Sequence, residues 1–94
     1  MFTGIQAYIQ SVVSGTLTAC EVLLQKNVQI AIHWEGGRHH ARDGRAAGYC
    51  YVNDVVLGID FLRNHGMKRV CYIDLDLHHG DGCSYFFSLN YKTV

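Results

Sequence analysis

Two short β-branched runs, separated by a loop and a helix-like segment, constrain the fold of this chain most. The first run, residues 28–34, is VQIAIHW and stops at a pair of glycines, and the second, residues 69–78, is RVCYIDLDLH. Apolar runs of this length bounded by turn residues predict buried strands. A strand, a crossover helix and a second strand form a right-handed βαβ unit, so we expect two strands of a parallel sheet and an α/β fold.

A first helix is predicted ahead of these runs. Apolar residues recur at steps of three and four between residues 5 and 26, which is the period of a helix with one buried side. Gly15 costs about 1 kcal/mol against alanine inside a helix, so a kink is allowed there. Residues 80–94 stay unassigned, apart from a helical turn or more at 84–89.

The connection between the two runs contains a long loop and a second helix. Residues 38–49 follow neither the strand nor the helix period and are predicted as a loop, which at this length is often functional. Asn53 or Asp54 is able to cap the helix that follows, and residues 64–66 are expected to close it.

Composition indicates a folded chain and excludes some classes of partner. Hydrophobic residues make up 49% and charged residues 17%, against about 25% charge in an average domain, so we expect a core. The formal net charge of +0 argues against binding to nucleic acid or to anionic lipid. Neither a secretory leader nor an unbroken membrane-spanning apolar run is visible. The absence of proline suggests the interior elements of a larger domain.

The second run carries a pattern typical of a metal site. The strand period of two places Asp74, Asp76 and His78 on one face. Two neighbouring carboxylates repel unless a cation or hydrogen-bond donors compensate them, and carboxylate with imidazole is a usual ligand set for catalytic zinc. An edge strand with its acidic face in solvent is the simpler alternative. A calcium loop is excluded, because His79 occupies the position that requires glycine and Tyr85 the position that requires glutamate.

The long loop carries His39 and His40, an adjacent pair that suits acid and base catalysis near neutral pH. Parallel strands end at one edge of a sheet, so this loop should meet the polar run at residues 74–82, with which the second strand ends. Asp74 and Asp81 are then available as carboxylate partners, the latter on a sharp turn between two glycines. A solvated histidine pair is the alternative reading.

Three other residues are assigned structural roles. His33 and Trp34 are expected to close the first strand by packing. Cys50 lies close to the histidine loop in sequence, but no local pattern for cysteine catalysis is present, and a small buried hydrophobic residue is predicted.

Three ordered blocks resemble the zinc-dependent histone deacetylases, most closely those of class I. The blocks are HWEGGRHHA at 33–41, GYCYVND at 48–54 and YIDLDLHHGDG at 72–82, and the similarity runs from about Gly15 to Phe87. The resemblance implies the three-layer arginase/deacetylase-type fold around a parallel sheet. It also implies that residues 1–94 form part of a catalytic domain, whose other N- and C-terminal parts are absent.

The resemblance implies roles for the polar residues. Asp76 and His78 would be zinc ligands, and His39 and His40 the tandem active-site histidines, paired with Asp74 and Asp81 respectively. The main-chain oxygens of Asp74, Asp76 and His78 would help to hold a structural potassium ion.

The resemblance also implies how substrate is bound. Gly48 would offer its carbonyl to the substrate amide, and Tyr49 would form one wall of the acetyl-lysine tunnel. The family usually has phenylalanine at that wall, so the hydroxyl of Tyr49 is a departure from the pattern.

The resemblance implies that the activity is hydrolysis of N-acetyl-lysine in histone tails or other proteins. The implied role is transcriptional repression in the nucleus, with the cytoplasm as a second location. A corepressor complex is the implied partner. Zinc would activate water, and His40 would take its proton. In the family a third zinc ligand and a catalytic tyrosine lie further downstream, so the 94-residue chain alone is expected to be inactive. The alternatives are a non-enzymatic product or an acetylpolyamine amidohydrolase-like enzyme.

Overall fold

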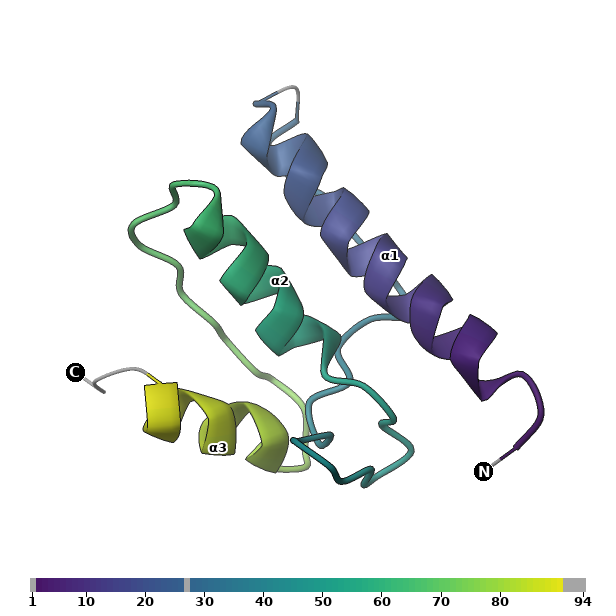
Figure 1. Cartoon of the computed structure of the whole chain (residues 1–94). Coiled ribbons are helices and arrows are strands. Elements are labelled where there is room, and N and C mark those ends of the chain that lie inside the picture. The colour runs from purple at the N-terminus through teal and green to yellow at the C-terminus, as the bar shows by residue number, and fades with distance from the viewer. Residues whose placement is uncertain (1, 27, 91–94) are drawn as a thin grey trace.

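Three helices joined by two long non-helical segments make up the computed structural model, which describes residues 2–26 and 28–90 (Figure 1). The helices are α1 (Ile5–Leu24), α2 (Asp54–Asn64) and α3 (Asp81–Asn90). α1 and α2 lie side by side, and α3 contacts α2. The loop that carries the histidine pair lies at the end of the α1–α2 pair where α2 begins, next to α3.

α1 confirms the first predicted helix, and it is continuous through Gly15 with no break in its helical assignment. The glycine makes room for a neighbouring residue. A Cβ atom at position 15 would lie 2.5 Å from Cε1 of His33, and the imidazole ring of His33 therefore sits directly against the backbone of α1. Close packing, and not a kink, accounts for this glycine.

Gly15→Ala is expected to destabilise the chain by about 1 to 3 kcal/mol, because overpacking outweighs the roughly 1 kcal/mol that alanine gains in a helix. Urea unfolding followed by circular dichroism measures the change. Ser14→Ala, at an exposed neighbouring position, is the control. In the double variant with His33→Ala the clash is removed, so the two effects should not add. A Gly15→Ala chain more stable than the parent would contradict this packing.

α2 begins where its capping residues predict. Asn53 is the N-cap, and its side-chain oxygen accepts a hydrogen bond from the backbone N–H of Val56 at 3.0 Å. At the other end, the backbone N–H of His65 donates to the carbonyl of Phe61, and Gly66 has a φ of 97°. Both boundaries follow from local residue chemistry.

α3 occupies the segment that the sequence left largely unassigned. It starts at Asp81, three residues before the expected turn, and buries Gly82 and Cys83. The backbone N–H of Cys83 donates to the carbonyl of His39 at 3.2 Å. The start of α3 is therefore packed directly on the backbone of the histidine loop.

The two predicted strands are not formed among residues 2–26 and 28–90, where the only β-type pairs are isolated bridges within the histidine loop. A strand needs a backbone partner, and neither run finds one in the part of the chain described. Side chains that a sheet would cover are instead 67 to 94% exposed. They are Ile30, Ile32, Trp34, Ile73, Leu75 and Leu77. The prediction that Trp34 packs at the end of the first strand is therefore wrong, because Trp34 is exposed.

The two runs nevertheless lie along the same helix pair. Ala31 and His33 of the first run and residues 70–73 of the second line a cavity of about 400 Å³ together with side chains of α1 and α2. In the first run, exposed residues alternate with the half-buried Ala31 and His33, which is the period of two expected of a strand. The parallel sheet remains a prediction.

α1 is long and apolar enough, by length and composition alone, to cross a membrane. The core helix of a folded domain meets the same two criteria. One side of α1 packs against α2, and the hydroxyl of Thr16 donates a hydrogen bond to the carboxylate of Asp54 at 2.5 Å. These contacts show that one side of α1 is packed in the helix pair with α2.

Candidate active site

The structure brings each histidine of the loop against an aspartate more than thirty residues away. Nδ1 of His39 lies 2.7 Å from Oδ2 of Asp74, and Nδ1 of His40 lies 2.6 Å from Oδ1 of Asp81. The two imidazole rings are neighbours, with centroids 4.2 Å apart. Two histidine–aspartate pairs thus share one small region at the start of α3.

Both aspartates are held in the charged form, so each must accept the hydrogen bond. The pKa of Asp74 is lowered chiefly by a hydrogen bond from the Tyr72 hydroxyl and next by the bond to His39. The pKa of Asp81 is lowered chiefly by its bond to His40. Nδ1 of each histidine therefore carries the proton in these bonds, and Nε2 is not engaged by these two carboxylates.

Asp76 and His78 lie beside the pair. Oδ1 of Asp76 is 3.2 Å from Nδ1 of His78 and 4.0 Å from Nε2 of His39, and the rings of His40 and His78 have centroids 6.2 Å apart. The backbone N–H of His78 donates to Asp76, which lowers the pKa of this carboxyl group. A carboxylate and an imidazole, both accessible to solvent, thus border the histidine pair.

The carboxylate of Asp76 and the imidazole of His78 are ligand types that suit zinc, but two ligands are too few for a catalytic zinc site. A catalytic zinc site uses three protein ligands and one open position. Within residues 2–26 and 28–90, no group of three histidine, cysteine, aspartate or glutamate side chains is arranged to hold a metal ion. Asp76 and His78 therefore amount to an incomplete ligand set.

Glycines shape the region by allowing close approach. A Cβ atom at Gly80 would lie 2.6 Å from the Asp74 carboxylate, and one at Gly48 would overlap the ring of His40. Gly48 and Tyr49 both have positive φ values, 52° and 60°. That conformation is strained for an aromatic residue and typical of functional sites. Tyr49 is 86% exposed.

Tyr72, Thr16 and the interactions of Asp54 were missed by the sequence reasoning. The position of Tyr72 two residues before Asp74 puts both on one face of an extended segment, a signal that could have identified the hydrogen bond between them. The contact of Thr16 with Asp54 spans 38 residues and has no local signal.

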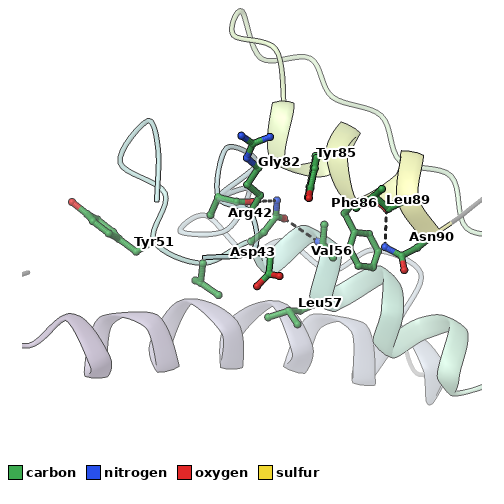
Figure 2. Close-up of a pocket in the computed structure, with 13 residues that line it drawn as sticks. Arg42, Asp43, Tyr51, Val56, Leu57, Gly82, Tyr85, Phe86, Leu89 and Asn90 are labelled. Atoms are coloured by element: carbon green, nitrogen blue, oxygen red, sulfur yellow. Dashed lines mark hydrogen bonds between the residues drawn. The ribbon is translucent and has the colours of Figure 1, made fainter. Parts of the chain in front are cut away.

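A separate cavity of about 580 Å³ lies between α2, α3 and the histidine loop (Figure 2). Its walls are mainly apolar, with Val56, Leu57 and Leu89 among them, and the Arg42 guanidinium stacks on Tyr85 at 4.8 Å from the ring centroid. It contains none of the paired histidines or aspartates. The polar cluster, and not this cavity, is therefore the candidate active site.

Comparison with known proteins identifies relatives over nearly the whole chain. Residues 1–93 match the histone deacetylase domain family. Histone deacetylase 8 of Xenopus laevis is 48% identical over 91 residues, which cover 97% of this chain and 28% of that protein. Histone deacetylase 8 of Xenopus tropicalis is 50% identical over 91 residues, covering 97% of this chain and 24% of that protein. Histone deacetylase clr6 of Schizosaccharomyces pombe is 43% identical over 88 residues, covering 93% and 21%. The chain spans about a quarter of the length of these relatives.

Proposed function

The chain belongs to the histone deacetylase family, and on that premise we propose that it supplies part of the active site of a zinc-dependent enzyme that hydrolyses N-acetyl-lysine to lysine and acetate. The observation that carries this proposal is the cluster of two histidine–aspartate pairs beside Asp76 and His78. Acetylated histone tails, or other acetyl-lysine proteins, are the proposed substrates. Transcriptional repression, a corepressor complex and a nuclear location are proposed with them.

His40 is the proposed general base, because it is the more accessible histidine. The side chain of His40 is 19% exposed and that of His39 is 7% exposed. Asp81 accepts the Nδ1 proton of His40, so Nε2 is free to take a proton from water and later return it to the leaving amine. Asp81 also stabilises the imidazolium that forms. His39, held by Asp74, is proposed to tune the charge of the site.

Asp76 and His78 are the residues proposed to hold zinc. When bound, zinc would polarise the acetyl carbonyl and lower the pKa of a bound water. A third ligand is needed, and we propose that it comes from a part of the catalytic domain that corresponds to the portion of the longer relatives outside the matched segment. The main-chain oxygens of Asp74, Asp76 and His78 are the proposed donors for a structural potassium ion.

Gly48 and Tyr49 are the proposed contacts for substrate. The exposed ring of Tyr49 offers an apolar face on which the aliphatic chain of acetyl-lysine can stack, and the Gly48 carbonyl is the proposed acceptor for the substrate amide N–H. The phenolic hydroxyl adds a polar group to this wall.

A chimera tests the proposed function. Replacing the matched segment of the Xenopus laevis relative with this chain should give an enzyme that releases acetate from an acetyl-lysine histone peptide, within about tenfold of the parent enzyme, since the chain is 48% identical to that relative over the replaced segment. Chelation should abolish turnover and added zinc should restore it. The 94-residue chain alone should show no turnover.

Two variants and a second substrate sharpen this experiment. His78→Ala should lower the zinc content of the chimera, whereas His65→Ala, at the end of α2, should not. An acetylated diamine tests the acetylpolyamine alternative. A folded, zinc-loaded chimera that hydrolyses only the diamine, or neither substrate, would overturn the assignment.

A further inference from the structure

The N-terminal end of α2 holds the beginning of the histidine loop through a buried carboxylate. Asp54 is only 1% exposed, and its two oxygens accept hydrogen bonds from the backbone N–H groups of Gly37 at 3.0 Å and Arg38 at 2.7 Å. These N–H groups immediately precede His39. The carboxylate therefore determines where the chain enters the histidine pair.

The preceding residue holds the other side of the same loop. The side-chain amide of Asn53 donates to the carbonyl of Ala41 at 2.9 Å and lies 3.5 Å from the carbonyl of His39. Its oxygen is occupied by the N–H of Val56 as the cap of α2. Asp54 thus binds the backbone N–H groups that precede the histidines, and Asn53 binds carbonyl groups within and after the histidine pair.

Asp54 is in turn connected to α1. The Thr16 hydroxyl donates its single proton to Asp54, so the Thr16 oxygen accepts from Nδ1 of His33, which lies 2.9 Å away. The carboxylate consequently has three donors, from α1 and from two loop amides. A buried carboxylate needs such donors, and each donor would lose its partner if the carboxylate were removed.

We propose that Asn53 and Asp54 are positioning residues, which hold residues 37–41 so that the imidazoles of His39 and His40 meet Asp74 and Asp81. Their relevance to catalysis rests on the proposed function, but the geometry they enforce does not. A displacement of about 1 Å in such a site can cost about a hundredfold in rate, so fixing the loop at both ends matters.

The alternative is that the two residues only cap α2 and stabilise the fold. Asn53→Ser separates the roles, because serine is a good N-cap for Val56 but is too short to reach the carbonyls of His39 and Ala41. A pure capping role predicts that this variant leaves the histidines unchanged.

The test uses the 94-residue chain with ¹⁵N-labelled histidine and follows the Nδ1–H protons that hydrogen-bond to the carboxylates. Asp54→Asn and Asn53→Ser should shift or broaden at least one of these resonances and speed its exchange with water by about tenfold or more, with helix content unchanged in Asn53→Ser. Asp60→Asn and Asn64→Ser, which change the same residue types further along α2, are matched controls and should change neither resonance.

Unchanged resonances in both test variants, at unchanged helix content, would overturn the proposal. If Asp54→Asn fails to fold, the histidine resonances of Asn53→Ser and Thr16→Val test the proposal instead. Thr16→Ser keeps the hydroxyl and is the control for Thr16→Val. In the chimera, Asn53→Ser should lower kcat about tenfold or more and leave KM nearly unchanged. If the chimera with the unsubstituted chain is inactive, the proposed function is refuted. If the histidine resonances of the variants still shift in that case, the positioning role is retained.

Discussion

Replacing His40 by alanine should lower kcat of the chimera by about 10²- to 10⁴-fold, the usual contribution of a general acid–base. The reason is the pair that His40 forms with Asp81 at 2.6 Å, which orients the imidazole and leaves Nε2 for the substrate side. His39 is a poor substitute, because its side chain is buried and bonded to Asp74. Initial rates on an acetyl-lysine peptide, with bound zinc measured in parallel, check this.

Zinc content should stay at the parent level in His40→Ala, since Asp76 and His78 are unchanged. His65→Ala is the matched control, because His65 stacks on Phe61 at the end of α2, away from the histidine pair, and it should retain normal turnover. A His40→Ala enzyme within about threefold of the parent would rule out His40 as the base.

Gly82→Ala is expected to destabilise the chain by about 1 to 3 kcal/mol or more, the range for overpacking at a tight contact. A Cβ atom at position 82 would lie 2.7 Å from the carbonyl oxygen of His39 and 2.8 Å from the carbonyl carbon of His40, and closer still to the Ala41 oxygen. Backbone atoms cannot rotate away as a side chain can, so α3 must move. Urea unfolding monitored by circular dichroism measures the loss.

The sign of this effect is informative, because alanine in place of glycine normally favours a helix by up to about 1 kcal/mol. Ser84→Ala, at an exposed position of α3, is the control and should change stability by less than about 0.5 kcal/mol. Movement of α3 should also lengthen the bond from the Cys83 N–H to the His39 carbonyl. A Gly82→Ala chain as stable as Ser84→Ala would contradict the close packing of α3 on the loop.

Local chemistry made α1 and α2 predictable. The start of α2 follows from the capping oxygen of Asn53, and α1 follows from its apolar period. The histidine and aspartate residues of the site stood out because two polar clusters each follow an apolar run. Residue type and short-range spacing are sufficient for inferences of this kind.

The predicted strands show the limit of the same reasoning. Residues 30–34 alternate between exposed and half-buried side chains, as in a strand, yet the ladder requires a neighbouring backbone, which a local pattern does not specify. Exposed Ile30, Ile32 and Leu75 are the side chains that a completed sheet would cover. The two strands and the parallel sheet therefore remain predictions, because neither run has a strand partner among residues 2–26 and 28–90.

The amino-acid sequence by itself determined the family, the helices α1 and α2 and the chemical groups available to the site. The tertiary structure decided which groups hold these residues in place: Thr16 and the loop amides on Asp54, and the glycine contacts of α1 with His33 and of α3 with the loop. These contacts join residues from 16 to more than 40 positions apart. No periodicity extends over such distances, so only the folded chain reveals why Gly15, Gly82 and Asp54 occupy their positions.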